Sequence, residues 1–120
     1  MNVVADVLVG LVALIHLYIV VLEMFLWTTP RARAAFGTTE EFAKESAPLA
    51  ANQGLYNGFL ALALIWGLIA SDPTGFQLKL YGIVCVIVAG LYGAATANKR
   101  ILFVQVVPGT LTLIALLLAR

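Results

Sequence analysis

The stretch HLYIVVLEMFLW, residues 16–27, places a histidine and a glutamate inside an otherwise continuous apolar run. His16 and Glu23 are seven positions apart, so on a helix they share a face and lie about 10 Å apart along its axis. Trp27 continues this face one turn later. An ionisable group in a membrane-length segment costs about 2.5 kcal/mol or more, so it normally faces a protein interior, a partner or a water-filled cavity. The stretch therefore predicts a polar site within a membrane helix.

The composition around this stretch excludes a soluble protein. Of 120 residues, 62% are hydrophobic and 11% are charged, far from the usage of soluble domains. The net charge of +1 gives no reason to expect nucleic acid as a partner. The first apolar run lacks a basic start and a cleavage pattern, and it is too long for a signal peptide. We therefore expect an integral, multi-pass protein of the cell inner (plasma) membrane whose first helix is retained.

Four apolar segments predict an all-α fold, an integral membrane four-helix bundle. Each has about 18 to 25 residues, enough to cross a hydrocarbon core of about 30 Å. Residues 1–120 are expected to form a single transmembrane domain. We place its helices at about 3–27, 49–70, 76–97 and 101–118.

Residues 28–48 form the only long connection, between the first two predicted helices. Thr39 followed by Glu41 and Phe42 is typical of a capped, short amphipathic helix. Phe36 and Phe42 could dip toward the apolar boundary, which would make the connection an interfacial cap. A solvated loop with one helical turn is the alternative interpretation.

The second predicted helix opens with ANQGLYNG, residues 51–58, the densest group of amide side chains in the chain. Its polar side chains span about 140° and form one broad face. They are Asn52, Gln53, Tyr56 and Asn57. Gly54 and Gly58 are expected on the other side of the helix, where their spacing permits close helix contact within the bundle or across a homodimer.

Pro108 predicts an irregularity in the last helix. It removes a backbone donor and pushes away the carbonyl of Val104, which leaves an acceptor beside Gln105. Gln105, Pro108 and Thr112 share one helix face. We expect a kink or a pocket there.

The basic residues predict the orientation. With four spans, both termini lie on one side of the membrane and the 28–48 connection on the other. The connection side carries five basic residues, Arg31, Arg33, Lys44, Lys99 and Arg100, whereas the terminal side carries Lys79 and Arg120. By the positive-inside rule the connection is cytoplasmic and both termini are extracytoplasmic.

In this orientation the polar residues of all four helices fall in the cytoplasmic half of the bilayer, within about 10 Å of the interface, with His16 beneath them near the midplane. This concentration predicts a cytoplasm-facing polar cavity. Glu23 would be its acid or base and His16 a second proton carrier. The expected ligand-binding residues are Asn52, Gln53, Tyr56, Asn57, Tyr92, Gln105 and Trp27.

Simple helix packing is the competing interpretation, because interhelical hydrogen bonds between such side chains average about 0.6 kcal/mol each. Trp27 is also a typical interface anchor. One His, one Cys and one intramembrane Glu do not make a metal site, and no cofactor fingerprint is present, so neither a metal nor a cofactor is expected.

Four blocks together resemble the domain-of-unknown-function family thirteen-oh-four, small four-helix membrane proteins found mainly in bacteria. The blocks are HLYIVVLEMFLW, ANQGLYNG, GLYGAAT (residues 90–96) and ILFVQVVPG (residues 101–109). The resemblance spans nearly the whole chain. It implies a four-helix membrane fold and brings no activity with it.

Three functions compete at this level. The first is a site, with or without proton-transfer chemistry, for a small amphiphilic or lipid-like molecule that enters from the cytoplasmic leaflet, so membrane lipids and such a ligand are the expected partners. The second is a proton-coupled small-molecule exporter, although Glu23 lies nearer one interface than that mechanism favours. The third is a structural or assembly subunit, in which replacing Glu23 by Gln should be harmless.

Overall fold

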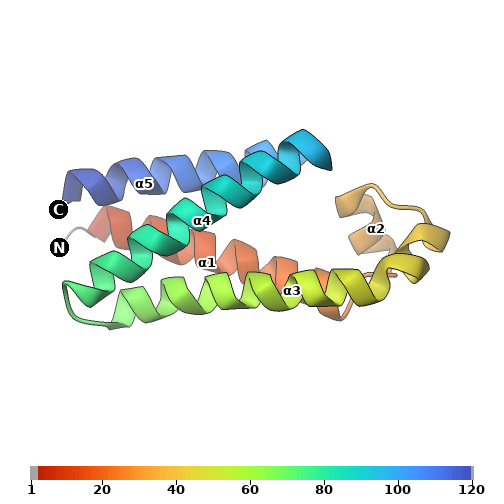
Figure 1. Cartoon of the computed structure of the whole chain (residues 1–120), viewed down its shortest axis with the longest axis horizontal. Coiled ribbons are helices and arrows are strands. Elements are labelled where there is room, and N and C mark those ends of the chain that lie inside the picture. Colours follow the sequence, from red (N-terminus) through yellow and green to blue (C-terminus); the bar gives the residue numbers. More distant parts are fainter. Residues whose placement is uncertain (1–2, 120) are drawn as a thin grey trace.

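The computed structural model describes residues 3–119, and all of its regular structure is helical. The elements are α1 (Val3–Met24), α2 (Pro30–Phe36), α3 (Glu40–Ile69), α4 (Thr74–Thr96), the π-helical turn η1 (Leu102–Val106) and α5 (Val107–Ala119). The long helices run along the longest axis of the molecule, with both ends of the chain at one end and α2 at the other (Figure 1). The all-α class is therefore confirmed.

The described residues contain five α-helices rather than the four of the predicted bundle, because the connection holds a helix of its own. Thr29 begins α2 by accepting a hydrogen bond from the backbone N–H of Ala32 at 3.4 Å, and Pro30 follows in the first turn, where its missing N–H costs nothing. Gly37, with φ of 70°, ends the helix in the left-handed conformation that glycine adopts most easily.

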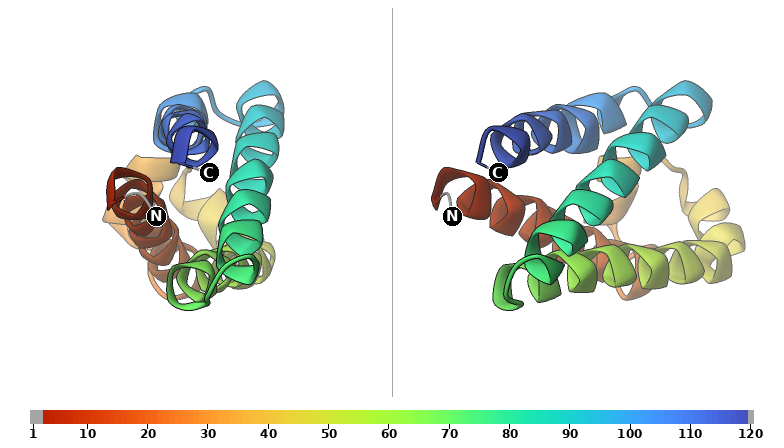
Figure 2. Two further views of the ribbon diagram at one scale, coloured as in Figure 1. Left: turned by 90° about the vertical axis from the view of Figure 1, so that its left-hand side faces the viewer. Right: turned by 60° about the vertical axis from the view of Figure 1, so that its left-hand side comes forward.

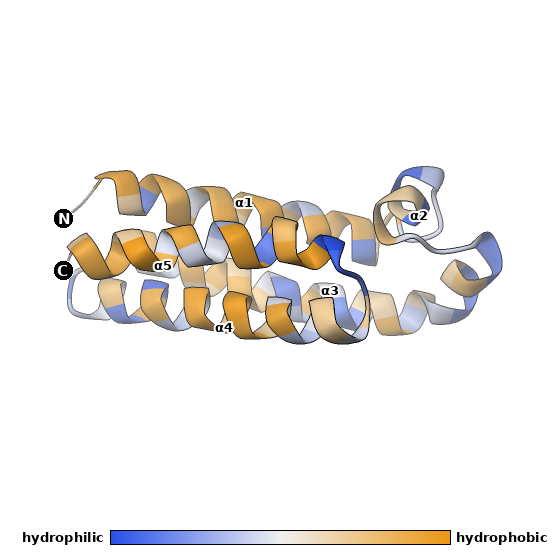
Figure 3. Cartoon of the chain, turned by 90° about the horizontal axis from the view of Figure 1, so that it is seen from above, coloured by the Kyte–Doolittle hydropathy of each residue, from blue (hydrophilic) through white to orange (hydrophobic). Residues whose placement is uncertain are grey.

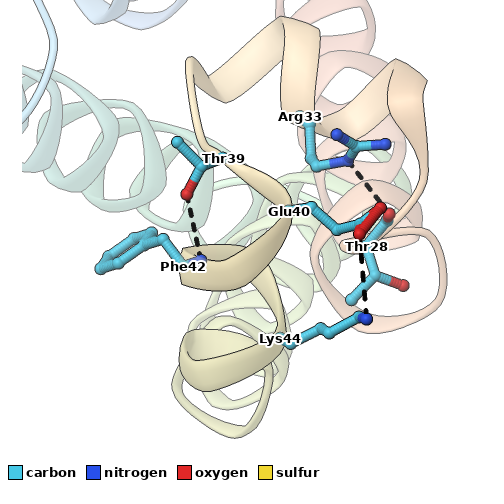
Figure 4. A network of polar contacts seen from close by, with 6 residues as sticks. All are labelled: Thr28, Arg33, Thr39, Glu40, Phe42 and Lys44. Atoms are coloured by element: carbon cyan, nitrogen blue, oxygen red, sulfur yellow. Dashed lines mark hydrogen bonds and ion pairs between the residues drawn. The ribbon is translucent and has the colours of Figure 1, made fainter.

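The predicted short helix that starts after Thr39 is the beginning of α3. Thr39 Oγ1 accepts the backbone N–H of Phe42 at 3.1 Å, so the predicted cap is present (Figure 4). The helix then continues through Pro48 to Ile69. The predicted start of the second long helix near residue 49 was wrong. Pro48 removes only one backbone donor, and the residues before it, EEFAKESA, favour helix strongly, so the helix continues through the proline.

The other helix bounds differ little from the predicted ones. α1 ends at Met24 instead of Trp27, and the chain turns there through a backbone hydrogen bond from Leu26 to Val21 at 3.1 Å. α4 lies within two residues of its predicted span, and η1 with α5 within one. The expected irregularity before Pro108 is the π-helical turn η1.

The core lies where α1, α3, α4 and α5 meet, on the half of the molecule nearer the chain ends. Val9, Val12, Leu64, Ile83 and Leu116 are among its buried residues. The helices surround this core, and α4 crosses α3 obliquely (Figure 2). Gly82 permits that crossing, because a Cβ there would lie 2.7 Å from Leu64 Cδ2.

Three helices of the described chain are long and apolar enough to cross a membrane: α1, α4 and the continuous segment Leu102–Ala119. α3 is outside this group, and its amide side chains Asn52, Gln53 and Asn57 dilute its apolar part. Hydrophobic residues dominate the long helices, whereas hydrophilic residues gather toward the end that carries α2 (Figure 3). The chain is thus built like a membrane protein, with its polar end at α2.

Candidate functional site: a buried carboxylate between α1 and α3

The Glu23 carboxylate is buried and is the centre of a polar cluster, the Glu23 cluster, that it forms with Gln53 and Asn57. Its side chain is 1% exposed. Asn57 Nδ2 donates a hydrogen bond to Glu23 Oε1 at 2.6 Å, and Gln53 Nε2 donates one to Oε2 at 2.9 Å. Both donors come from α3, so two amides hold the two oxygens of a carboxylate on α1. These three predicted site residues are brought together by the structure.

Gly54 decides which face of α3 meets α1. A Cβ at position 54 would lie 2.6 Å from Met24 Cγ and 3.1 Å from Glu23 Cβ, so the two helices approach closely at this level. Asn57 is three positions further on and shares this face. The predicted separation of the glycine face from the amide face is therefore wrong, because Gly54 and Asn57 contact the same stretch of α1.

His16 forms a second, separate polar contact on the same side of α1. The ring is fully buried, and its Nδ1 lies 2.9 Å from the carbonyl oxygen of Val12, so Nδ1–H donates to that carbonyl. Nε2 is then an acceptor for the amide of Gln105, whose Nε2 lies 3.0 Å away. No hydrogen bond within residues 3–119 joins the His16 pair to the Glu23 cluster, which lies two helical turns further along α1.

The π-helical turn carries Gln105 at the contact with His16. Pro108 cannot donate to the carbonyl of Val104, and the chain responds with a wider turn in which Val107 N–H bonds to Leu102 O. Gly90 on α4 leaves room for this turn, because a Cβ at position 90 would lie 2.8 Å from Val106 Cγ2 and 3.1 Å from Gln105 Cβ. Turns of this kind occur frequently at functional sites.

The remaining predicted ligand-binding residues lie elsewhere. Asn52 is exposed, and Tyr56 and Tyr92 are 60% and 72% exposed. None of the three forms a side-chain hydrogen bond with Glu23 or His16. Asn52 and Tyr56 share a face four positions apart, so the broad polar face of α3 is divided between the α1 contact and the outer surface.

Trp27 belongs to the polar end of the molecule. Its Nε1 donates to Ser46 Oγ on α3 at 3.0 Å, and its ring packs on Phe36 of α2 with centroids 4.8 Å apart. Ser46 was missed by the sequence analysis, since a helical serine that donates to the carbonyl four residues back, here Phe42 at 2.6 Å, carries no distinctive signal.

A second contact joins α2 to the segment that follows α4. Arg100 Nη1, in the turn after α4, donates to the carbonyls of Ala34 and Ala35 at 3.0 and 3.4 Å. The sequence signal for it is the adjacent pair Lys99 and Arg100, from which the sequence analysis predicts orientation only. Around α2, Arg33 Nε donates to Thr28 O at 3.3 Å, and Lys44 lies 3.9 Å from Glu40 (Figure 4).

An apolar pocket of about 350 Å³ lies between α1 and α5, lined in part by Leu11, Ile15, Pro108 and Leu111. None of the predicted site residues lines it. The shared polar cavity therefore stays a prediction. No group of three His, Cys, Asp or Glu side chains between residues 3 and 119 is placed to hold a metal ion.

Comparison with known proteins places this architecture in a family. The family model described as "Protein of unknown function (DUF1304)" matches residues 10–117. The chain belongs to the DUF1304 family. The uncharacterized protein YpaA of Lactococcus lactis subsp. lactis (strain IL1403) is 34% identical over 119 residues, which cover 98% of this chain and 97% of that protein. No solved structure matches. The family predicted from the four sequence blocks is confirmed for this DUF1304 protein.

Proposed function

We propose that this DUF1304 protein is a multi-pass protein of the inner (plasma) membrane in which α1, α3, α4 and the segment formed by η1 and α5 build a four-helix bundle. Three of these segments are long and apolar enough to span. α3 is antiparallel to its neighbours, and its length of 30 residues exceeds what a span needs. The basic residues at the α2 end support a cytoplasmic α2 and extracytoplasmic termini.

Within this bundle, the Glu23 cluster binds the polar head of a small amphiphilic molecule that enters from the cytoplasmic leaflet. One observation carries this proposal. Glu23 is only 1% exposed, yet its carboxylate accepts a hydrogen bond from Gln53, a residue that is itself exposed. The cluster therefore extends from the helix contact to the molecular surface at the level of residue 53. Glu23 is the group that can exchange a proton with the head, and the chain of the amphiphile stays among the apolar side chains and lipid.

In this proposal His16 and Gln105 form a second polar contact, which lies deeper than the Glu23 cluster, toward the middle of the bilayer. The neutral His16 ring, with Nδ1–H given to Val12 O, keeps Nε2 as the only nitrogen that can take up a proton. Asn52, Tyr56 and Tyr92 stand at the outer surface in this proposal, and Trp27 lies at the cytoplasmic end.

A structural role is the second candidate, and the same hydrogen bonds favour it. Both carboxylate oxygens of Glu23 accept a hydrogen bond from α3, next to the close contact of Gly54. Such contacts fix one helix against another with no ligand present. Because amide donors hold both oxygens, this packing role predicts that Glu23→Gln lowers stability, and not that the change is harmless as expected for a structural subunit from the sequence alone. The binding function predicts loss of ligand binding with little change in stability.

The test uses the full chain in detergent, a set of dodecyl compounds as probes, and native mass spectrometry with thermal unfolding as readouts. The probes are dodecylamine, dodecanol and dodecanoate. A binding site predicts that at least one probe binds and is lost in Glu23→Gln and Asn57→Ala, while the unfolding midpoint changes little. Glu45→Gln, the same change at an exposed carboxylate of α3, should retain the probe. Loss of stability in both site variants with no bound probe would favour packing alone.

A further inference from the structure

We infer that the head group held at Glu23 is a primary ammonium, so that the ligand is a cationic amine with a hydrocarbon chain. This inference rests on the proposed function and adds the chemical class of the head. The first argument is the state of the carboxyl group. Both of its oxygens accept N–H groups, and no described residue offers an acceptor for a carboxyl proton, so the hydrogen-bond arrangement suits the ionised form.

That negative charge has no cationic partner in the described part of the chain. Within residues 3–119 no Lys, Arg or His nitrogen forms an ion pair with Glu23. The nearest basic residues in sequence are engaged elsewhere, since Arg31 donates to Tyr18 Oη at 3.1 Å and Arg33 to Thr28 O. A buried charge without a partner is costly, and two neutral amides supply hydrogen bonds but no charge. A ligand that brings a positive charge would balance the site.

The free acceptors at the site match the donors of an ammonium group. A carboxylate offers about four lone-pair positions, of which the two amides use two. The side-chain carbonyl oxygens of Gln53 and Asn57 accept no hydrogen bond from residues 3–119. A primary ammonium has three N–H donors and no acceptor. An alcohol has one donor and no charge, a carboxylate is repelled, and a quaternary ammonium carries the charge without a donor.

The experiment compares four probes with the same twelve-carbon chain on the full protein in nanodiscs of neutral lipid at pH 7. They are dodecylamine, dodecyltrimethylammonium, dodecanol and dodecanoate. Binding is measured by native mass spectrometry after release from the disc. We expect dodecylamine to bind at least tenfold more tightly than each of the others. Glu23→Gln should remove this preference, and the control Glu45→Gln should retain it.

A second variant guards against misfolding of Glu23→Gln. Gln53→Ala removes an exposed side chain that supplies one acceptor, so it should stay folded and bind dodecylamine about tenfold more weakly. Equal binding of dodecyltrimethylammonium, or tighter binding of dodecanol or dodecanoate that still depends on Glu23, would overturn the ammonium assignment and leave the proposed function standing. If no probe binds in a Glu23-dependent way, both the assignment and the proposed function fail.

Discussion

Nε2 of Gln105 lies 3.0 Å from Nε2 of His16, although 89 positions separate the two residues. The contact joins the middle of the first helix to the π-helical turn of the last one. Because Nδ1–H of His16 is directed to Val12 O at 2.9 Å, Gln105 is the donor in this pair. The hydrogen bonds of His16 to Val12 O and from Gln105 together fix the position and the tautomer of a fully buried imidazole.

Replacing Gln105 by Leu should destabilise the protein by about 1 to 3 kcal/mol, because Nε2 of the buried His16 would lose its only donor. Unfolding in mild detergent with increasing dodecyl sulfate measures this change. Gln77→Leu, at an exposed position of α4, is the matched control and should change stability little.

Adding His16→Leu to Gln105→Leu should cost less than the sum of the two single changes, because the double variant leaves no unpaired polar group. Strict additivity would show that the two side chains are not coupled and would contradict the hydrogen bond.

Gly54 and Gly58 should respond oppositely to alanine. A Cβ at Gly54 would come within 2.6 Å of Met24 Cγ and 3.1 Å of Glu23 Cβ, whereas at Gly58 the nearest atom is Val20 Cγ2 at 3.8 Å. Gly54→Ala should therefore destabilise the protein by about 1 to 3 kcal/mol through overpacking. Gly58→Ala should be neutral or stabilise it by up to about 1 kcal/mol, since alanine favours helix. Thermal unfolding of the two variants under the same conditions measures this difference. Equal stability of the Gly54→Ala and Gly58→Ala variants would contradict the close contact at Gly54.

Arg100→Gln should loosen α2 without unfolding the bundle. The guanidinium donates to the last carbonyls of α2, Ala34 and Ala35, and no other described side chain does so. Hydrogen exchange of the α2 amides should become faster, while the amides in the middle of α1 keep their protection. Lys99→Gln removes a neighbouring charge with no such hydrogen bond, so it serves as the control. Unchanged exchange in α2 would mean that Trp27 and Phe36 suffice to hold it.

The orientation can be tested with single cysteines in a Cys85→Ala background. A cysteine at Glu41 should be protected from a membrane-impermeant thiol reagent added to intact cells, and a cysteine at Asp72, in the turn between α3 and α4, should react. Both positions are exposed in the structure. The opposite labelling pattern would reverse the proposed topology and place the Glu23 cluster near the outer leaflet.

The sequence predicts the helical class because the apolar segments are long and sharply bounded, and it places the polar residues near one end. It does not determine which polar residues meet. The rotation of α3 about its axis depends on the contact of Gly54 with Met24, 30 positions away, and that contact selects Gln53 and Asn57 over Asn52 and Tyr56. Likewise, a π-helical turn brings Gln105 into contact with His16. From the sequence, Pro108 predicts an irregularity in this helix but not the type of turn or the contact.

The start of α3 was hidden for a local reason. Pro48 is typical of a helix start, so it favours a helix that begins near residue 49 and conceals the helix-favouring residues before it. In the structure it lies inside one helix of 30 residues, Glu40–Ile69. The residues before Pro48 thus join the helix that supplies Gln53 and Asn57.

A helix of 30 residues is about 45 Å long, whereas the hydrocarbon core is about 30 Å thick. Its surplus turns carry Ser46, which holds Trp27, so α3 and the α2 cap are mechanically connected. A thinner bilayer increases the tilt of a long helix. Because α3 is one continuous helix, such a tilt would displace its projecting end sideways. In the proposed membrane orientation, α2 would then shift across the end of the helices as membrane thickness changes, so we expect its position to depend on lipid chain length.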